Sequence, residues 1–502
     1  MKAKQVYLGI DLGAESGRVV AGLWDGRKMR LQEIHRFPNG AVTIADSLRW
    51  NTLGLWAEIQ NGFALAAKKY GSSIVSVGVD TWGVDFALLS KSGELLGLPY
   101  HYRDARTRGM MQKSFARVPR KEIFAVTGVE FMEINTLFQL LALKERSPEV
   151  LDAAETLLMM PDYLNFCLSG SRVGEFTIAT TSQCVNPQKR AWATGLLKKL
   201  GLPTKIFPKL VAPGTRVGQL RPELAARTGL GAINVIAPAA HDTASAVAAV
   251  PTRNTGRADW AYLSSGTWSL LGVELPEALL SPEALRLNIT NEGGVDGTYR
   301  LMKNIMGLWL VQECRRAFAA QDREFSYDEL VLLAAKASPF RSLVNPDEVR
   351  FLNPPNMPRA IQDFCRETSQ PIPKTPGQLV RCVLESLALT YAAVLEGIES
   401  LTGTNIKVVH VVGGGSRNQL LNSFTASACG RPVIAGPVEA TAFGNLLVQA
   451  RSQGEIATLA DIRAAVRASS EVVQFDPTDA AAWQEARGRF AELRTVPCSG
   501  GL

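Results

Sequence analysis

Two ionisable residues, His241 and Asp242, stand in a stretch of small apolar residues, VIAPAAHDTASAVAAV, at positions 235–250. A carboxylate buried without a partner costs several kcal/mol, so such a pair must be hydrogen-bonded, charge-paired or used in chemistry. Asp242 is therefore the first candidate for a catalytic base. A structural interpretation stays open beside it: Asp is a preferred N-cap residue, and the segment after Asp242 has the composition of a helix.

Three turns of small residues, at 13–17, 264–267 and 413–416, are candidates for binding phosphate. Short side chains let backbone N–H groups approach an anion closely, although each segment also fits an ordinary turn. The chain contains neither GxxxxGK[ST] nor GxGxxG at these turns, which excludes a Walker A loop and a Rossmann fingerprint. A nucleotide would have to be held by turns from both halves of the chain.

Asp11 ends the first expected strand, directly before the first of these turns. From there its carboxylate could hold Mg²⁺ through water beside phosphates, or support the turn by hydrogen bonds. Asp80 and Asp85 flank Trp82 and resemble a glycosidase pair, but two carboxylates in one hairpin need not keep the separation that such mechanisms require. We expect this segment to contact a sugar instead. The absence of GxSxG and HExxH disfavours other hydrolases.

The elements that must position these residues follow from hydrophobic periodicity and turn residues. In the first half we expect antiparallel strands at 6–10, 18–23 and 29–37, a helix at 53–70, and paired strands at 74–80 and 84–90 closed by a turn at 91–94. Mixed helix and loop should occupy 110–230, with helices at 137–145 and 196–200, and a strand at 234–237 should lead to Asp242.

The polar segment PTRNTG at 251–256 predicts a domain boundary near residue 251. After it, strands at 261–263 and 268–273 around a small-residue turn repeat the start of the chain, which suggests two related domains. We further expect helices at 305–319, 378–401 and 418–429, Pro-rich loops at 354–358 and 371–376, and a strand at 406–412.

The composition is that of a globular protein: 502 residues, 46% apolar and 20% charged, enough for two sizeable domains. The net charge of +7 is scattered, without a basic arm or an RNA-binding signature, so nucleic acid is not an expected partner. The charge fits small anionic ligands or simply aids solubility.

An odd number of cysteines without CxxC or zinc spacing predicts reduced thiols in the cytoplasm, although Cys365 and Cys382 could meet in space. The seven are Cys167, Cys184, Cys314, Cys365, Cys382, Cys429 and Cys498. No apolar run has the length of a signal peptide at the start or of a membrane span elsewhere.

Long blocks in order along nearly the whole chain carry a resemblance to a known family. They include GIDLGAESGR (9–18), EIHRFPNG (33–40), VDTWGVDFALL (79–89), HYRDARTRGM (101–110), LLMMPDYL (157–164), HDTASAV (241–247), YLSSGTWSL (262–270), NITNEGG (288–294), KNIMGLWLVQ (303–312), VVGGGSRNQLLN (411–422) and RPVIAGPVEATAFGN (431–445). The sequence resembles the FGGY family of carbohydrate kinases, in particular its members that act on L-rhamnulose.

The resemblance implies an α/β fold of the actin-like ATPase (ribonuclease H-like) type, with two related domains, each on a mixed five-stranded sheet, around a deep catalytic cleft. Residues 1–250 would bind sugar and carry the first phosphate turn and the catalytic Asp, and 251–502 would bind nucleotide. The implied reaction uses ATP and Mg²⁺ to phosphorylate the 1-hydroxyl of L-rhamnulose in L-rhamnose catabolism. The implied partners are the ketose and ATP, without nucleic acid or membrane, in a monomer or homodimer.

The resemblance also implies roles for individual residues. Asp242 matches the proton acceptor, and the expected sugar contacts are Gly83, His241, Asp242, Thr243 and Asn304. The expected ATP contacts are Ala14, Glu15, Ser16, Gly17 and Arg18 in the first turn, with Thr267, Gln312 and Gly414 from the second half. The Mg²⁺ role of Asp11, through water, comes from its position beside the turn and completes this expected site.

Glu15 departs from the family pattern, in which Ser or Thr is common, and we expect its charge to point away from the phosphates. Two alternatives stay open: a sister kinase acting on L-fuculose or another ketose, and a chaperone-type actin-like ATPase. The sugar-side blocks at 79–86, 241–247 and 288–294 argue against the chaperone, which has no use for a sugar pocket.

Overall fold

The computed structural model describes residues 5–495 and consists of two compact units, each discontinuous in sequence. The first comprises Met1–Gly256, Glu274–Leu301 and Ala440–Ser470. The second comprises Arg257–Val273, Met302–Glu439 and Glu471–Leu502. Two segments from the second half of the chain therefore belong to the first unit.

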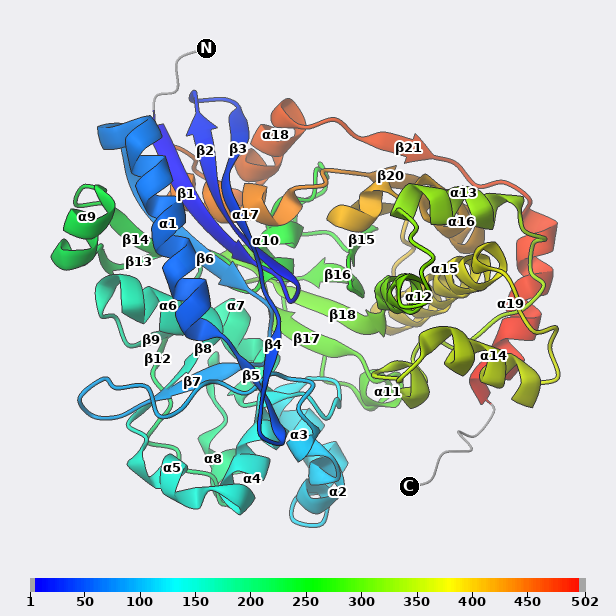
Figure 1. Ribbon diagram of the computed structural model, residues 1–502, viewed down its shortest axis with the longest axis horizontal. Helices are drawn as coiled ribbons and strands as arrows, with labels where there is room; N and C mark the ends of the chain where they lie inside the picture. The colour runs from blue at the N-terminus through cyan, green and yellow to red at the C-terminus, as the bar shows by residue number, and fades with distance from the viewer. Residues whose placement is uncertain (1–4, 496–502) are drawn as a thin grey trace. The chain divides into compact units, whose positions relative to one another are not determined.

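The first unit is built on a six-stranded mixed sheet in the order β13-β14-β6-β1-β2-β3 (Figure 1). Strands β1, β2 and β3 form an antiparallel meander, as expected, while β6 and β14 run parallel to β1. The bounds are β1 (Gln5–Leu12), β2 (Ser16–Trp24), β3 (Met29–Pro38), β6 (Ile74–Thr81), β13 (Thr215–Gln219) and β14 (Asn234–Ala237).

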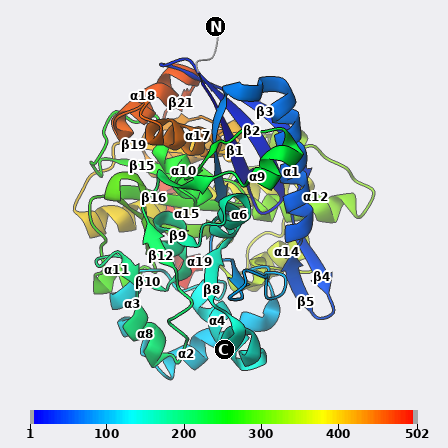
Figure 2. The same ribbon diagram turned by 90° about the vertical axis from the view of Figure 1, so that its left-hand side faces the viewer.

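Alternation along β1 assigns its side chains to two faces of this sheet, because successive residues of a strand point in opposite directions. Val6, Leu8, Ile10 and Leu12 join a hydrophobic core with helices α1 (Thr52–Tyr70) and α6 (Met160–Ser169). The other face, to which Gly9 and Asp11 belong, packs against α17 (Ala440–Ser452), on the opposite side of the sheet from α1 in Figures 1 and 2. The core face is thus apolar and the α17 face carries Asp11.

Helix α10 (Asp242–Ala248) crosses α17 at unusually close range. A methyl group added at Gly444 of α17 would lie 1.8 Å from the carbonyl oxygen of Ser245 in α10, so only glycine fits there. This contact fixes the helix that begins at Asp242 against a helix supplied by the second half of the sequence.

The remaining elements of the first unit are short and lie mostly outside the central sheet. Its helices are α2 (Met110–Phe115), α3 (Arg120–Thr127), α4 (Thr136–Arg146), α5 (Pro148–Ala153), α7 (Phe176–Ala179), α8 (Thr194–Lys199), α9 (Pro222–Thr228), α11 (Pro282–Arg286) and α18 (Leu459–Ser469). Its further strands are β4 (Ala41–Ile44), β5 (Ser47–Trp50), β7 (Phe86–Leu89), β8 (Thr156–Met159), β9 (Val173–Glu175), β10 (Val185–Asn186), β11 (Ala191–Trp192), β12 (Lys209–Val211) and β17 (Thr290–Gly293).

Two expectations for this half were wrong. Strand β7 does not pair with β6; it pairs antiparallel with β8, while β6 lies inside the central sheet. The region 110–230 contains short strands, including β8, as well as helix and loop. Both differences arise from partners distant in sequence. The expected helices at 53–70, 137–145 and 196–200 are confirmed as α1, α4 and α8.

The second unit repeats the strand pattern of the first. Strands β15 (Trp260–Ser265) and β16 (Trp268–Leu275) form an antiparallel hairpin, and β19 (Val408–Val412) runs parallel to β15. Next come β20 (Val433–Ala435), parallel to β19, and β21 (Val473–Phe475), antiparallel to β20. The sheet that contains them has seven strands, because β18 (Tyr299–Met306) pairs with β16 and β17 pairs with β18; the order is β17-β18-β16-β15-β19-β20-β21. The expectation of five-stranded sheets was therefore wrong for both sheets, although their mixed character is confirmed.

The helices of the second unit are α12 (Trp309–Ala319), α13 (Tyr327–Lys336), α14 (Met357–Glu367), α15 (Pro376–Thr402), α16 (Gln419–Cys429) and α19 (Ala480–Thr495). Helix α12 starts four residues later than expected, because Ile305 and Met306 belong to strand β18 (Tyr299–Met306). Pro358 lies in the first turn of α14, where proline is tolerated, and not in a loop.

Within residues 5–495, α15 is the one helix long and apolar enough to cross a membrane, and 83% of its most apolar window is buried inside the protein. It is thus a core helix. The thiols of Cys382 in α15 and Cys365 in α14 meet and hydrogen-bond, but the two cysteines do not form a disulfide. Cys498 lies outside the described residues.

Candidate active site

Three carboxylates gather at the carboxyl ends of three neighbouring strands of the first unit. Asp11 of β1 is in register with Asp80 of β6, and Thr81 forms a parallel bridge with His241, the residue before Asp242. The strand order β14-β6-β1 therefore places all three side by side. In open α/β sheets, this edge is where ligands bind.

Asp11 is paired with Arg18, which lies directly opposite it on β2. Nε and Nη2 of Arg18 donate to Asp11 Oδ2 at 3.0 and 2.6 Å, and the two side chains are 15% and 13% exposed. Such a cross-strand pair follows from hairpin register. The guanidinium expected at the nucleotide phosphates is thus held on Asp11.

Asp80 is fully buried and accepts a 2.6 Å hydrogen bond from Asn445 of α17 at Oδ2. Its Oδ1 is buried without a hydrogen-bond partner in the described part of the chain. Burial, and then the charges of Asp11 and Asp242, raise the pKa of Asp80 well above its usual value. The sequence offered Asp80 as one of a glycosidase-like pair with Asp85 or as part of a sugar-contacting segment, and not as a neighbour of Asp11.

Asp242 is the first residue of α10, and the N-cap is His241, so the cap interpretation was wrong by one position. Asp242 Oδ1 accepts hydrogen bonds from the backbone N–H of Thr243 at 2.5 Å and from its hydroxyl at 3.2 Å. The side chain is 31% exposed. Desolvation raises the pKa of Asp242, the nearby His241 opposes this, and Asp11 adds to it. A partly exposed carboxylate with a raised pKa has the properties that a general base needs.

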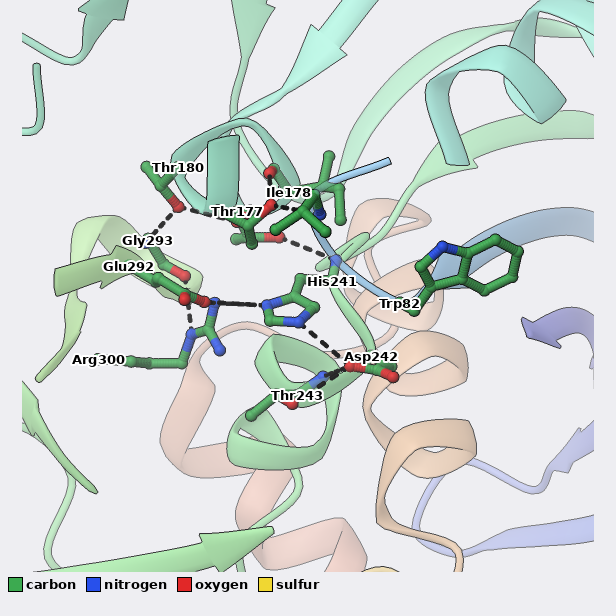
Figure 3. Close-up of polar contacts among 12 residues, drawn as sticks. Trp82, Thr177, Ile178, Thr180, His241, Asp242, Thr243, Glu292, Gly293 and Arg300 are labelled. Atoms are coloured by element: carbon green, nitrogen blue, oxygen red, sulfur yellow. Dashed lines mark hydrogen bonds and ion pairs between the residues drawn. The ribbon is translucent and has the colours of Figure 1, made fainter. Parts of the chain in front are cut away.

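His241 lies between Asp242 on one side and Glu292 with Arg300 on the other (Figure 3). Its Nε2 is 3.3 Å from Asp242 Oδ1, and its Nδ1 is 3.0 Å from Glu292 Oε2 and 3.1 Å from Arg300 Nη2. Glu292 and Arg300 join the first unit through the segment Glu274–Leu301. Neither was among the expected site residues.

The backbone before Asp242 is anchored by a buried carboxylate, Glu175. Its Oε2 accepts from the backbone N–H of Ala240 at 3.2 Å and from the hydroxyl of Thr177 at 2.5 Å. Thr177 in turn accepts from the backbone N–H of His241 at 3.3 Å (Figure 3). Burial raises the pKa of Glu175 to about 7 despite these hydrogen bonds.

Gly83, the expected sugar-binding backbone position, precedes a strained residue. Val84 has φ of 66°, a left-handed conformation that a β-branched residue rarely adopts. Hydrogen bonds hold it there: the Val84 N–H donates to Thr181 Oγ1 at 3.0 Å, and Thr136 Oγ1 donates to the Val84 carbonyl at 2.5 Å. Such strain persists only where the surroundings impose it, and it is common at functional sites.

Asp85 fixes the other end of this loop. It is buried and accepts hydrogen bonds from Trp50 Nε1 at 2.6 Å, Trp82 Nε1 at 3.0 Å and Gln139 Nε2 at 2.8 Å. Trp82 is 5% exposed and packs against Trp50 in a tilted arrangement with ring centroids 3.9 Å apart. The Trp82 ring therefore packs in the core beside Gly83 and offers little exposed surface on which a sugar could stack.

The first of the turns expected to bind phosphate is short. The Gly13 N–H donates to the Ser16 carbonyl at 2.9 Å, and Asn39 braces the turn by donating to the Gly13 carbonyl at 2.7 Å. Ser16, Gly17 and Arg18 already belong to β2, so of the five ATP contacts expected here only Ala14 and Glu15 lie in the loop itself. The side chain of Glu15 is exposed.

Gly17 has a packing role as well as an expected ligand role. A methyl group there would lie 2.3 Å from the ring of Phe37 on the neighbouring strand. A side chain at this position would require the Phe37 ring and the Leu12 side chain to move, whatever else the turn does.

The second unit brings together the expected nucleotide residues from its own half. Ser264 and Val412 are in register at the ends of β15 and β19, so the turns that follow these strands are neighbours. A methyl group at Gly415 would lie 2.0 Å from Ser265 Oγ, while one at Gly414 would meet nothing within 4 Å. Gly414 thus leaves open space where a ligand could approach.

Thr267 and Gln312 are in contact in this unit: Gln312 Nε2 donates to Thr267 Oγ1 at 3.3 Å. Gln312 Oε1 is buried and accepts no hydrogen bond from the described residues. An unused buried acceptor of this kind is available to a donor on a ligand. Asn304 lies on β18, also in the second unit, and is partly exposed.

The carboxylates of the first unit fit a hydrated divalent cation better than a directly bound one. Among the residues described, no group of three His, Cys, Asp or Glu side chains could hold a bare ion. Asp80 Oδ1 and the oxygen of Asp11 not paired with Arg18 are hard acceptors, and Mg²⁺ commonly keeps several of its waters. A cation would also relieve the repulsion between the carboxylates.

Two sheets with the same hairpin-plus-parallel pattern, with acidic residues and glycine turns at the strand ends, define a protein of the actin-like ATPase fold. The chain belongs to the FGGY family of carbohydrate kinases: residues 6–249 match the N-terminal domain of that family, and residues 261–453 match its C-terminal domain. It is therefore a phosphotransferase of the carbohydrate kinase class.

Close relatives cover almost the whole chain. The "Rhamnulokinase" of Bacteroides thetaiotaomicron is 47% identical over 97% of this chain and 99% of its own length. The "Rhamnulokinase" of Oceanobacillus iheyensis is 40% identical, covering 94% of this chain and 98% of its own.

Solved structures share the fold at much lower identity. A ligand-bound xylulose kinase from Lactobacillus acidophilus superposes with a TM-score of 0.81 at 16% identity, covering 99% of each chain. Plasmodium falciparum glycerol kinase with ADP gives 0.78 at 15% identity, covering 98% of this chain and 99% of its own. The α/β actin-like ATPase fold expected from the sequence is confirmed.

Proposed function

We propose that this protein transfers the γ-phosphoryl group of ATP to the 1-hydroxyl of L-rhamnulose, giving L-rhamnulose 1-phosphate and ADP in L-rhamnose catabolism. The observation that carries the proposal is the identity of 40 to 47% to proteins called rhamnulokinase, over at least 94% of the chain for the two relatives compared above. Sugar kinases of other specificity share only the fold, at 15 to 16% identity in the two structures compared.

In the proposed mechanism, Asp242 removes the proton of the acceptor hydroxyl. The hydroxyl oxygen forms a bond to the γ-phosphorus while the bond from that phosphorus to the β,γ-bridging oxygen breaks, and ADP leaves with the electron pair. The proton goes to Asp242. All contacts to this carboxylate from described residues are made at Oδ1, so Oδ2 is the oxygen that faces the hydroxyl.

We propose that the ketose is bound through Gly83, His241, Thr243 and Asn304. Thr243 is buried, with its hydroxyl on Asp242, and both ring nitrogens of His241 have protein partners, so these two residues would contribute chiefly by holding the base. The strained conformation of Val84 supports a role for the Gly83 backbone, because it fixes the direction of the peptide groups there.

We propose that ATP is bound by the turn at 14–18 and by Thr267, Gln312 and Gly414, with Glu15 pointing away from the phosphates. Bound Mg²⁺ would neutralise charge on the phosphates, and Asp11, with Asp80 behind it, would hold its water shell. The buried acceptor on Gln312 and the open space at Gly414 support the nucleotide assignment.

For the organisation of the protein, we propose that residues 1–250 carry sugar binding and the base, and that 251–502 carry nucleotide binding. We further propose a cytoplasmic monomer or homodimer whose partners are ATP and the ketose, without nucleic acid or membrane. The scattered charge and the burial of α15 support this assignment.

The test is ADP release by the purified protein with Mg²⁺ and a panel of L-rhamnulose, L-fuculose, L-xylulose, D-xylulose and glycerol. We expect the highest kcat/KM with L-rhamnulose, and product phosphorylated at C1 by NMR. A higher kcat/KM with L-fuculose would assign the protein to the sister activity, and ADP release no higher with any sugar than without one would refute the kinase proposal.

Asp242→Asn tests the base. We expect kcat to fall by about 100- to 10,000-fold, the usual contribution of a general base, while calorimetry still detects sugar binding. Asp25→Asn, in an exposed turn between β2 and β3, is the matched control and should leave kcat unchanged. A retained kcat in Asp242→Asn would remove Asp242 from the role of base.

A further inference from the structure

Glu292 and Arg300 form a buried ion pair directly behind His241, on the side away from Asp242 (Figure 3). Arg300 Nη2 donates to Glu292 Oε2 at 2.9 Å, and Arg300 Nε donates to the Gly293 carbonyl at 3.0 Å. Glu292 lies on β17 and Arg300 on β18, so the pair is held by regular secondary structure. The Gly293 N–H donates to Thr180 at 2.8 Å, which fixes the end of β17.

The three side chains are withdrawn from water. Arg300 is 0%, Glu292 5% and His241 8% exposed. Burial acts to raise the pKa of Glu292, but the charges and hydrogen bonds of Arg300 and His241 outweigh it and lower the pKa. A buried pair of this kind is weak evidence for stability, because desolvation offsets most of the attraction. A contribution to stability therefore does not explain why the Glu292–Arg300 pair lies against His241.

The contacts restrict where His241 carries its proton. Nδ1 lies 3.0 Å from a carboxylate oxygen of Glu292 and 3.1 Å from Nη2 of Arg300, so a protonated Nδ1 has Glu292 as its acceptor and an unprotonated Nδ1 has Arg300 as its donor. Nε2 faces Asp242 Oδ1, which as a carboxylate only accepts. An unprotonated Nε2 would point its lone pair at a lone pair of Asp242 Oδ1, whereas an unprotonated Nδ1 can accept a hydrogen bond from Arg300. The arrangement therefore favours a proton on Nε2, directed at the base.

We propose that Glu292 and Arg300 are positioning residues for phosphoryl transfer: they orient His241 so that its Nε2–H engages Asp242 Oδ1 and leaves Oδ2 for the hydroxyl of the substrate. The proposal rests on Asp242 being the base. The contacts described above join Glu292 and Arg300 to His241, so their effect on Asp242 passes through the imidazole ring.

A double-mutant cycle tests this, because residues that act through one another show non-additive effects. We expect Glu292→Gln to lower kcat by about tenfold in the native protein but by less than about twofold when it is combined with His241→Asn. The KM for ATP should stay within about twofold, because the pair does not belong to the nucleotide residues. Equal factors in both backgrounds would overturn the proposal.

Glu274→Gln is the matched control. Glu274 and Arg463 form another buried pair in the first unit, at 3.0 Å with 2% and 0% exposure, and no contact described for them involves His241. Both Gln variants should lower the thermal midpoint, but Glu274→Gln should change kcat by the same factor in the native background and in His241→Asn. Coupling of the control to the same degree would show a merely structural effect and would also overturn the proposal.

Arg300→Lys keeps the experiment decisive if Glu292→Gln does not fold. Lysine retains the charge opposite Glu292 but cannot donate to Glu292 and the Gly293 carbonyl from one planar group. We expect the same coupling to His241→Asn. If Asp242 were not the base, Asp242→Asn would retain the kcat of the native protein, which distinguishes that outcome from a failure of the present proposal. Additive factors together with an inactive Asp242→Asn would overturn only the roles of Glu292 and Arg300.

Discussion

At the scale of residues, the proposal that Asp242 is the base predicts how the rate depends on pH. The carboxylate is partly exposed, yet desolvation and the neighbouring Asp11 raise its pKa, against the effect of His241. A base must be deprotonated to act, so a raised pKa moves the acidic limb of the rate profile upward.

We therefore expect kcat to fall with decreasing pH through a single limb whose midpoint lies above the ordinary aspartate value of about 3.9. His241→Asn should move this limb to higher pH, because the imidazole is the main group that lowers the pKa of Asp242. Initial rates between about pH 4 and pH 9 measure both. A limb that stays in place in His241→Asn would contradict the assigned electrostatics.

At the scale of elements, the loop between β6 and β7 depends on one buried carboxylate. Asp85 ties this loop to Trp50 on β5 and Gln139 on α4, which lets Val84 keep its left-handed conformation. Burial raises the pKa of Asp85 to about 6, so it is ionised and accepts hydrogen bonds at both oxygens in neutral solution.

Asp85→Asn replaces one acceptor with a donor that faces the amide of Gln139. We expect a loss of about 1 to 3 kcal/mol in the free energy of unfolding, the cost of an unsatisfied buried group. The KM for the ketose should rise and the KM for ATP should not, because the loop carries Gly83. Urea unfolding and steady-state kinetics measure the two effects, and an unchanged KM for the ketose would separate this loop from sugar binding.

The crossing of α10 and α17 is the second element-scale feature with a direct test. Gly444→Ala places a methyl group against the Ser245 carbonyl, and overpacking of this kind costs about 1 to 3 kcal/mol. We expect that loss in urea unfolding, together with a lower kcat, since α10 begins at Asp242.

Gly195→Ala in α8 of the same unit has no atom within 4 Å of the added methyl group and should change stability by less than about 1 kcal/mol. A Gly444→Ala variant as stable as Gly195→Ala would show that the two helices are not as close as described.

At the scale of the whole molecule, a buried carboxylate links stability to pH. Burial raises the pKa of Glu175 from 4.5 to about 7, so the folded state binds its proton more tightly than the unfolded state. The resulting stabilisation is fully present below pH 4.5 and is lost as pH rises through about 7.

Glu175→Gln should remove this dependence. We expect the stability of the native protein relative to the variant to decline by up to about 3 kcal/mol between about pH 4.5 and pH 8. Urea unfolding at several pH values measures it. A constant difference across this range would mean that Glu175 does not titrate there.

The sequence by itself determined the local structure and the kind of chemistry. Alternating apolar residues define β1, β2 and β3, and a tight turn leaves Asp11 and Arg18 opposite each other, since hairpin register follows from the loop. The helical period defines α1, α4 and α15 because it needs only near neighbours. The blocks around Asp242 and Thr267 were long enough to indicate the family.

Only the tertiary structure decided which distant residues share a site. Asp80 lies beside Asp11 because β6 runs parallel to β1, and parallel strands are joined by long connections whose partner strand has no local signal. The same applies to β7, which pairs with β8, and to Asn445, which returns to Asp80 from the far half of the chain. Glu292 lies in a block that the resemblance assigned to the sugar side, but neither it nor Arg300 was an expected site residue, because only the placement of β17 and β18 brings them to His241. Contacts between residues far apart in sequence are selected by the packing of the whole chain, which no short pattern contains.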